Sequence, residues 1–466
     1  MPLPSPAELR LACVCAGAAL GACASVDVPV LERAGGDGGA EAQVVSGGPA
    51  GGDTRADYCA SSGPALLVGS AAAGATATCS GQLAQSAFRY ALCTCDGYVS
   101  DHALATDSFD GTKGPYSPSG ARPGGSVGTN GNLNATGPIT VGGSLWATDA
   151  TGMTTSAAVA VAGELHAQGE VHSGPTLAVG ADAWLAGGVQ TSGDVTIGGT
   201  LHVPPSAPID VAGARKIAAV APGPVQVGPA CDCDPRALVD VAGFVEAHRT
   251  ANDDAAMAVD PRALENVQAA LTIAIPCGRA FFTRVGGTAP IRLAAQGHVA
   301  IFIGADLSTS SDFVVEAPAG SDVDLFVEGG VTVGGAFLVG DTSNPARART
   351  YVGGAGTVNL QGAAQLVGNL YAPRAQLALG GSASTTLYGS IFAARLSAGA
   401  DLDIHYDEAI LSSAARAGCA APTGCSTCRD CGNQACNSGT CGGCADSSQC
   451  CSPLVCRGGA CVAEIL

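Results

Sequence analysis

The chain has 466 residues, 67 of them glycine, and 47% of its residues are hydrophobic while only 4% are aromatic. A single globular core built from such small side chains would bury little area per residue, whereas a repetitive β-architecture packs small residues layer on layer. The formal net charge of −18 argues against nucleic acid or an anionic membrane surface as a partner, because both would repel the chain.

The N-terminus predicts export. Arg10 precedes an apolar run from Leu11 to Ala24, which is too short to span a bilayer and is typical of the core of a signal peptide. The run contains LGAC at positions 20–23, which resembles the lipobox of bacterial lipoproteins. This resemblance implies a signal peptide over residues 1–23 and lipidation of Cys23. Ordinary cleavage after residue 24, which would remove Cys23, is the alternative.

The 21 cysteines indicate an oxidising compartment. With the signal sequence, they predict a lipoprotein of the outer membrane or cell surface of a Gram-negative bacterium. No later segment has the uninterrupted apolar length of about 18 residues that a transmembrane helix needs.

Two segments precede the first repeat. Residues 24–57 are glycine-rich and acidic, which predicts a flexible tether. Residues 58–125 form a cysteine-containing unit in which Gln82–Leu92 has helical spacing. The cysteines of this unit are even in number and could pair among themselves. They are Cys59, Cys79, Cys93 and Cys95.

Residues 126–205 contain the first block of repeats. A Val or Ile followed by small residues recurs at Val141, Val161, Val179 and Ile197, at separations of 20, 18 and 18 residues. Alternating β-patterns precede these positions, and glycine occupies the corners, where sharp bends need it. This period predicts a parallel β-helix whose short strands stack on their successors.

Residues 206–289 interrupt the pattern and predict a helical insert or cap. Asp234-Pro235 and Asp260-Pro261 are each a helix-start signal, with Asp as the N-cap. Between them, residues 252–254 (NDD) resemble a calcium loop only in composition, and a polar loop between helices is the expected structure. The insert is flanked by Cys231, Cys233 and Cys277.

β-Repetition resumes over residues 290–412. The expected strands include residues 300–303, 324–327, 331–333, 368–372 and 389–393, and the series closes at residues 401–407. We therefore predict a mainly β fold: a parallel β-helix, or solenoid, with a small helical insert and a disulfide-rich C-terminal module.

The closing segments GNLYAP (368–373), GSIFA (389–393) and IHYD (404–407) resemble the last coils of a bacterial surface-protein domain. That domain is related to the choice-of-anchor and polymer-forming (bactofilin-like) β-solenoids. The resemblance covers about a third of the chain. It implies a parallel β-helix exposed at the cell surface, with no established catalytic residues.

Residues 413–466 form a cysteine-rich tail whose ending is similar to knottin-like disulfide modules. Such a segment has almost no core, so disulfides must hold it together. Zinc is the competing interpretation because several cysteines have C-x2-C spacing. Disulfides are favoured, since the tail has no histidine and the compartment is oxidising. The tail cysteines are Cys419, Cys425, Cys428, Cys431, Cys436, Cys441, Cys444, Cys450, Cys451, Cys456 and Cys461.

The cysteine count predicts a link between the tail and the body. The tail has an odd number of cysteines, and so does the rest of the mature chain. If the four cysteines of the N-terminal unit pair internally, one of Cys231, Cys233 and Cys277 must bond to a tail cysteine. Cys419, at the junction, is the expected partner.

Few residues suggest chemistry. Alternation places Asp401, Asp403 and Asp407 on one side of a strand, as a general acid or base or as calcium ligands. A solvated face that blocks edge-to-edge aggregation is the favoured alternative, and no cofactor is expected. Trp146 and Trp184 occupy related repeat positions, where they could stack on sugars or close the end of a coil.

These observations predict an envelope-anchored structural or binding protein with a non-catalytic body, serving adhesion, matrix or surface scaffolding. Its expected partners are the membrane, through the lipid anchor, and a surface polysaccharide or protein. Two alternatives stay open. One is a carbohydrate-active enzyme of the polysaccharide lyase or hydrolase type, which needs converging carboxylates. The other is a scaffold that self-assembles through its solenoid ends.

Overall fold

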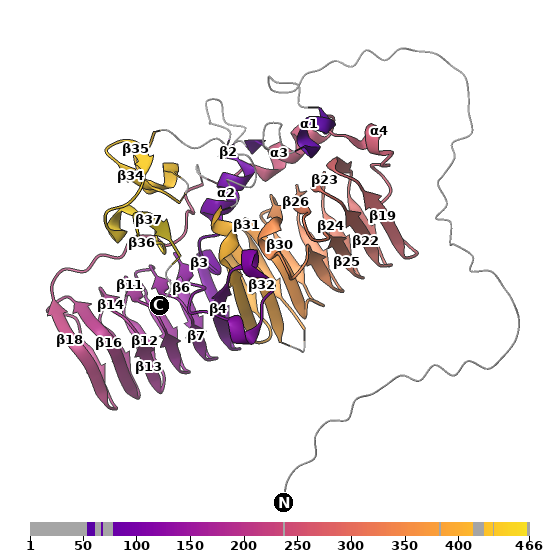
Figure 1. Ribbon diagram of the computed structural model, residues 1–466. Coiled ribbons are helices and arrows are strands. Elements are labelled where there is room, and N and C mark those ends of the chain that lie inside the picture. Colours follow the sequence, from indigo (N-terminus) through magenta and orange to yellow (C-terminus); the bar gives the residue numbers. More distant parts are fainter. Residues whose placement is uncertain are drawn as a thin grey trace, which may run out of the picture. The chain divides into compact units, whose positions relative to one another are not determined.

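The computed structural model describes residues 54–60, 67–68, 78–235, 238–381, 384–412, 424–431 and 433–463. Cys23, residues 24–53 of the expected tether and Cys419 lie outside the described residues. Residues 54–57, the end of the expected tether, are instead the N-cap and first turn of a short helix. Within the described residues, no helix is long and apolar enough to cross a membrane. The fold is a parallel β-solenoid of about 13 turns followed by a disulfide-rich C-terminal region, which confirms the predicted fold class (Figure 1).

The solenoid consists of a central coil and two blocks. The central coil contains β3 (Leu92–Ser100) and β4 (Leu104–Phe109). The first block contains β5 Val127–Thr129, β6 Asn132–Ala135, β7 Ile139–Val141, β8 Leu145–Ala147, β9 Met153–Thr155, β10 Val159–Val161, β11 Leu165–Ala167, β12 Val171–Ser173, β13 Thr176–Val179, β14 Ala183–Leu185, β15 Val189–Thr191, β16 Asp194–Val203, β17 Ile209–Val211 and β18 Arg215–Pro222. The second block contains β19 Leu271–Ile275, β20 Gly278–Phe282, β21 Val285–Gly287, β22 Ile291–Ala295, β23 His298–Ile303, β24 Leu307–Thr309, β25 Phe313–Glu316, β26 Asp322–Val327, β27 Val331–Val333, β28 Phe337–Val339, β29 Ala348–Val352, β30 Thr357–Leu360, β31 Gln365–Leu379, β32 Thr385–Ala398 and β33 Leu402–Asp407.

The remaining described elements are short. The helices are α1 Arg55–Cys59, α2 Ser80–Ala87, α3 Val241–His248 and α4 Asp254–Met257, and β1 (Leu67–Val68) pairs with β2 (Thr78–Cys79). The 3-10 helices are η1 Gly111–Lys113, η2 Pro118–Gly120, η3 Pro345–Arg347, η4 Glu408–Ser412, η5 Cys428–Cys431 and η6 Ser447–Gln449. The tail has two antiparallel hairpins, β34 (Ala435–Asn437) with β35 (Thr440–Gly442) and β36 (Val455–Arg457) with β37 (Ala460–Val462).

The N-terminal coil lies in the middle of the solenoid. Strand β3 pairs in parallel with β5 and β6 on one side and with β32 on the other, and β4 lies between β7 and β33. From β3 onward the chain therefore builds the first block outward from the centre to β18, crosses to β19 and builds the second block back to the centre (Figure 1).

This topology changes the expected domain boundaries. The unit at 58–125 is not separate from the solenoid, because β3 and β4 are part of it. The insert at 206–289 contains solenoid strands at both ends, from β17 to β21. The central coil escaped the repeat analysis because its neighbours on one side are about 300 residues away in the sequence, as the pairing of Leu402 with Leu104 shows. On the other side, Leu104 pairs with Ile139, which is farther along the chain than the 18 to 20 residues of the repeat.

The stacked core follows the repeat that the sequence shows. Val141, Val161, Val179 and Ile197 pair in register on successive coils, and each is at most 3% exposed. The glycine corners stack just as closely. A Cβ added at Gly180 would lie 2.2 Å from the Ala162 carbonyl oxygen, and one at Gly198 would lie 2.2 Å from the Gly180 oxygen. Only glycine fits these corners.

One of the two helices predicted in the insert exists, and it begins later than expected. Helix α3 starts at Val241, where the Asp240 side chain accepts a hydrogen bond from the Gly243 amide. No helix follows Pro261. Residues 261–266 form turns whose carbonyl groups accept hydrogen bonds from the sheet, from Thr283 to Pro261 and from Gly286 to Leu264. Pairing with the solenoid replaces the intrahelical hydrogen bonds there.

Residues 252–266 of the insert cap the β19 end of the solenoid. The Asp253 carboxylate accepts hydrogen bonds from the backbone amide and the Nε of Arg279, both at 2.9 Å. Asp254 accepts the Phe281 amide at 2.9 Å, and burial raises the pKa of Asp254 to about 6. The acidic loop at 252–254 therefore binds the edge of β20, which is a structural role.

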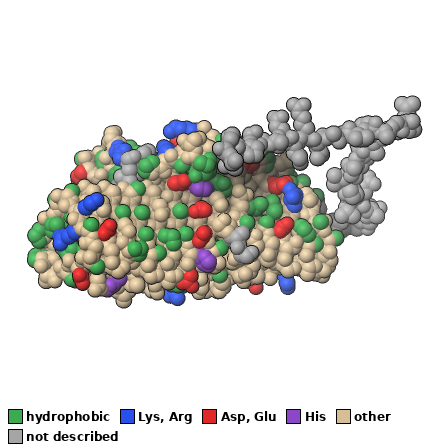
Figure 2. Space-filling view, turned by 90° about the horizontal axis from the view of Figure 1, so that it is seen from below, with side chains coloured by type: hydrophobic (Ala, Val, Ile, Leu, Met, Phe, Trp, Pro, Cys, Tyr) green, Lys and Arg blue, Asp and Glu red, His purple; other side chains and the backbone are tan. Residues whose placement is uncertain are grey.

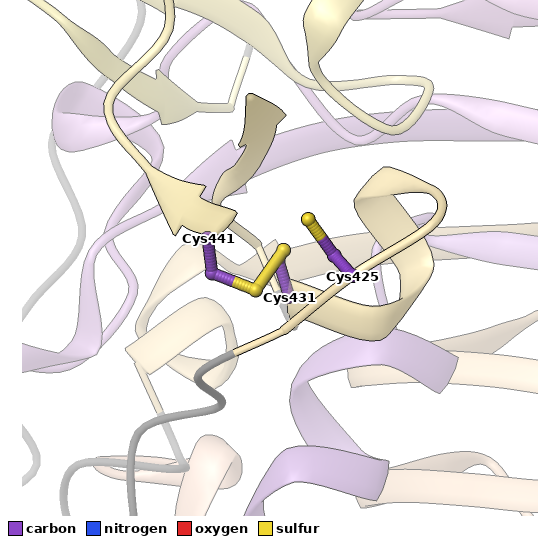
Figure 3. Close-up of side chains that lie close together, drawn as sticks. All are labelled: Cys425, Cys431 and Cys441. Atoms are coloured by element: carbon purple, nitrogen blue, oxygen red, sulfur yellow. A yellow bond between two sulfur atoms is a disulfide. The ribbon is translucent and has the colours of Figure 1, made fainter. Parts of the chain in front are cut away.

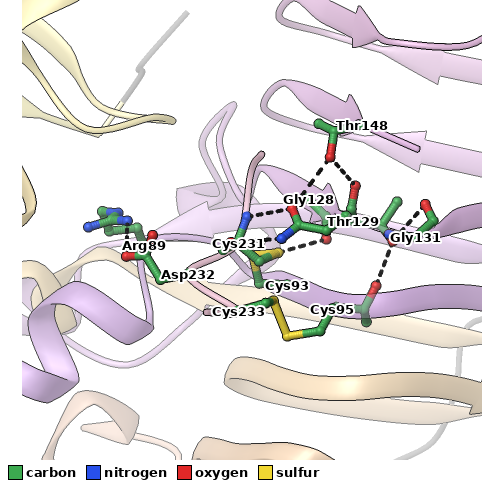
Figure 4. Close-up of a disulfide and its surroundings, with 12 residues drawn as sticks. Arg89, Cys93, Cys95, Gly128, Thr129, Gly131, Thr148, Cys231, Asp232 and Cys233 are labelled. Carbon is green, nitrogen blue, oxygen red and sulfur yellow. Dashed lines mark hydrogen bonds and ion pairs between the residues drawn. A yellow bond between two sulfur atoms is a disulfide. The ribbon is translucent and has the colours of Figure 1, made fainter. Parts of the chain in front are cut away.

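Among the described residues, three disulfides tie the body together, and the pairing differs from the prediction. Cys93 bonds to Cys231 and Cys95 to Cys233, each across 138 residues (Figure 4). Cys59 bonds to Cys277 across 218 residues. Internal pairing of the N-terminal cysteines was thus a wrong prediction. The tail link to Cys231, Cys233 or Cys277 was wrong as well, because all three already have partners in the N-terminal unit.

The spacing of the cysteines explains the paired bridges. Cys93 and Cys95 are two residues apart on β3. Cys231 and Cys233 are two residues apart in residues 223–235, which follow β18 and which we call the returning segment. Next to these bridges, the Asn130 side chain donates a hydrogen bond to the Cys231 carbonyl at 2.8 Å and accepts one from the Cys231 amide at 2.9 Å. The returning segment is therefore fixed to the central coil by both covalent and polar contacts.

Within the described part of the tail, the disulfides are Cys425–Cys436, Cys428–Cys451, Cys431–Cys441, Cys444–Cys456 and Cys450–Cys461. The tail also contacts the body. Asn433 donates to the carbonyl groups of Gln85 and Leu411 at 3.3 and 3.2 Å, and Arg429 forms an ion pair with Asp232 at 2.8 Å.

Candidate ligand-binding surface

A cluster of aromatic and acidic side chains lies on the outer face of the central coils. The register of the sheet places Tyr388 on β32 beside His405 on β33, and His405 beside Asp107 on β4. All three are partly exposed. Side chains that alternate outward on stacked strands form a row across the sheet. Chain segments that are far apart in the sequence thus contribute to one surface.

Asp107 joins the members of this cluster. Its carboxylate interacts with His405 Nδ1 at 2.7 Å and accepts the Tyr116 hydroxyl at 2.8 Å. Tyr116 stacks on His405 with 3.7 Å between ring centroids, and its ring centroid is 5.8 Å from that of Tyr388. Burial and the hydrogen bond to Asp107 raise the pKa of Tyr116 well above its usual value, so the hydroxyl stays a donor.

A shallow groove adjoins the cluster. It has a volume of about 500 Å³ and is lined mainly by apolar side chains. The acidic residues Glu316 and Asp341 also line it. Glu316 forms an ion pair with Arg292. Val367 lines the groove and pairs in register with Tyr388. The groove and the aromatic cluster therefore form one continuous surface, which we call the outer binding surface.

The distribution of charge on the solenoid is uneven. On the face seen in Figure 2, acidic and histidine side chains gather in a band near the middle, and most of the remaining face is uncharged.

The three aspartates predicted as ligands have different surroundings. Asp407 is buried, and its carboxylate accepts the amides of Gly111, Ala409 and Ala346 at 2.8 to 3.1 Å. Asp401 is exposed and accepts the Ala103 amide at 2.9 Å. Asp403 points outward beside the cluster, where its charge contributes to the raised pKa of Tyr116. They do not form one acidic row, because Asp407 turns inward as β33 ends.

The two tryptophans belong to a stacked ladder. Trp146, His166, Trp184 and His202 pair in register on successive coils. Their rings are nearly parallel, with centroid distances of 4.5, 6.2 and 3.6 Å along the series. A sugar ring stacks on an exposed aromatic face, and the ladder uses both faces of Trp184. Neither expected role, sugar stacking or closing the end of a coil, fits this geometry.

The cysteine groups with ligand-like spacing are cross-linked. Cys425, Cys431 and Cys441 lie close together (Figure 3), and so do Cys444, Cys450 and Cys461. Cys431 bonds to Cys441 and Cys425 to Cys436, and the second group is likewise paired. Zinc binds thiolates, and a sulfur atom in a disulfide has no thiolate to offer.

Comparison with known proteins gives one match. Residues 288–412 match the model of a domain of unknown function, DUF7305. This region contains β22 to β33 of the second block together with η4. No curated protein matches the chain, and no solved structure matches it.

Proposed function

We propose that the chain is an exported, envelope-anchored scaffold whose solenoid body is non-catalytic and binds an extended surface polysaccharide along the outer binding surface. The main support for this proposal is that the groove and the cluster of Tyr388, His405 and Tyr116 lie next to each other on one face. Glycan-binding sites combine aromatic rings with hydrogen-bonding groups. The proposal includes no metal or other cofactor.

Export is supported by the eight disulfides among the described residues. Attachment to the membrane is proposed through lipidation of Cys23. A lipid at this position would keep the solenoid at the envelope, where a rigid, cross-linked body resists proteolysis.

Metabolic labelling with a fatty acid tests the anchor. The wild-type chain is expected to carry label and to fractionate with membranes, whereas Cys23→Ala is expected to lose both. Globomycin, which blocks the lipoprotein signal peptidase, should leave the wild-type chain unprocessed. Absence of label on the wild-type chain would remove the anchor from the proposal.

Replacing Tyr388 with alanine tests the binding surface. Loss of one stacking ring is expected to weaken binding to envelope polysaccharide about tenfold. Co-sedimentation with insoluble polysaccharide from the cell envelope measures the change. Trp184→Ala is the matched control, because its ring faces are already covered by His166 and His202. Equal binding by Tyr388→Ala and wild type, or loss of binding in the control alone, contradicts the proposal.

One observation favours a carbohydrate-active enzyme as a second candidate. Asp107 orients the His405 imidazole at 2.7 Å, and Asp403 lies nearby on the same face. A histidine oriented by a carboxylate, as His405 is by Asp107, can act as a general base. Release of new reducing ends by wild type, abolished in both His405→Ala and Asp403→Asn, would support catalysis. Intact polysaccharide after long incubation with wild type would favour the scaffold.

A further inference from the structure

The two ends of the solenoid are different. At the β19 end the cap bonds the edge of β20 and β21 through the amides of Arg279, Phe281, Thr283 and Gly286. These contacts take the place of a further coil on two of the three sides. Among the described residues, no such segment covers the other end, where β17 pairs only with β15 and β18 only with β16.

The last coil at the β18 end leaves apolar side chains exposed. Ile217 and Val220 stack on Ile197 and Leu201, which are 1% and 0% exposed, so all four point into the core. Yet Ile217 is only half-buried and Val220 is 43% exposed. An unpaired strand edge over an open core is a surface on which another chain can add strands.

We propose that the β18 end binds the same end of a second copy of the chain, forming a two-fold symmetric dimer. Strand β18 is self-complementary about its midpoint, between Ala218 and Ala219. Antiparallel pairing there places Ile217 of each copy opposite Val220 of the other copy. Both residues face the core, so the apolar interior continues through the interface.

The other strand of the terminal coil fits the same symmetry. Pairing of β17 with its copy, centred on Asp210, places Ile209 opposite Val211. A two-fold axis through one corner of a three-sided coil also passes through the middle of the opposite side. One axis can therefore pair β18 with β18 and β17 with β17.

Charge is compatible with this register, with one exception. Arg215 and Lys216 of one copy lie opposite Pro222 and Ala221 of the other, so the basic side chains do not face each other. The two Asp210 side chains do meet on the outer face. Like charges that face each other across strands weaken the pair.

The assembly should stop at two copies. A filament would require the β18 end to bind the β19 end, where the cap already occupies the edges of β20 and β21. Among the described residues, only the β18 end leaves the strand edges of all its sides open, so two such ends pair and close the dimer. This inference is independent of the proposed ligand.

Sedimentation equilibrium of the full chain with its disulfides intact tests the dimer. Wild type is expected to approach twice the mass of its monomer as concentration rises. Val220→Asp should weaken the dimer at least about tenfold, since it buries a charge at the interface. Asp210→Asn should strengthen it about two- to fivefold by removing the facing charges.

Val99→Asp is the matched control, because Val99 is the other large apolar side chain exposed on the described surface, at 40%, and it lies on the central coil. This variant should dimerise like wild type. A monomeric wild type at all concentrations overturns the proposal, as does an equal effect of Val99→Asp and Val220→Asp. Masses that grow beyond the dimer would replace it with an open filament.

Discussion

Replacing Asp324 with alanine is expected to lower the free energy of unfolding by about 3–5 kcal/mol, the usual effect of breaking a buried ion pair. Asp324 and Arg349 lie on β26 and β29 with side chains 1% and 3% exposed, and Arg349 Nε donates to Asp324 at 2.6 Å. Without Asp324 the guanidinium group would lose its main buried partner.

The surroundings of this pair explain the size of the effect. Burial by itself would lower the pKa of Arg349, but the carboxylate of Asp324 more than compensates and raises it. Tyr58 on α1 is buried beside the pair, and its ring packs edge-on against His298 at 4.4 Å. Little water can reach the site, so the charge left behind stays poorly solvated.

Asp322→Ala is the control for Asp324→Ala. Asp322 also approaches Arg349, at 3.7 Å, but its side chain is 20% exposed. Its loss should lower the free energy of unfolding by about 1 kcal/mol or less. Guanidinium chloride unfolding of the oxidised proteins measures both values. Equal losses of unfolding free energy in the two variants would contradict the prediction, because they would show that burial does not set the size of the effect.

Removing both neighbouring bridges, Cys93–Cys231 and Cys95–Cys233, is expected to lower the free energy of unfolding by about 4–5 kcal/mol. Each bridge closes nearly the same loop of 138 residues. Either bridge alone therefore supplies most of the restriction on the unfolded chain. Replacing one pair by alanine should have a much smaller effect, set by local packing.

Comparison of three variants tests this non-additivity. The two single-pair variants and the four-residue variant are unfolded under identical oxidising conditions, with Cys59–Cys277 left intact in all three. The expected order is two small effects and one large one. Effects of the single pairs that sum to that of the four-residue variant would contradict the loop argument.

The solenoid was predictable because its signal is local. Alternating strands and corner residues such as Gly180 and Gly198 follow from the sequence, and they stack as the period predicts. The central coil stacks on the first block, but Leu104 and its partner Ile139 are farther apart in the sequence than the 18 to 20 residues of the repeat. Its pairing with β32 and β33 depends on the path of the chain through space, which the residues of β3 and β4 do not encode locally.

The candidate site was predictable only in part. Asp403 was identified from strand alternation, but Asp107, Tyr116 and Tyr388 were missed. His405 and Asp107 are 298 residues apart in the sequence, and no motif joins them. The cysteines show the same limit. An odd or even number of cysteines limits how many of them can form disulfides. Which cysteines bond to each other depends on which segments the solenoid brings together.

Peptide mapping of the chain isolated from its native envelope without reduction tests the central claim most directly. The claim is that an oxidised N-terminal coil lies in the middle of the solenoid, clamped by the returning segment. We predict peptides that link Cys93 to Cys231, Cys95 to Cys233 and Cys59 to Cys277. Free thiols at these positions, or links from Cys231, Cys233 or Cys277 to the tail, would contradict it.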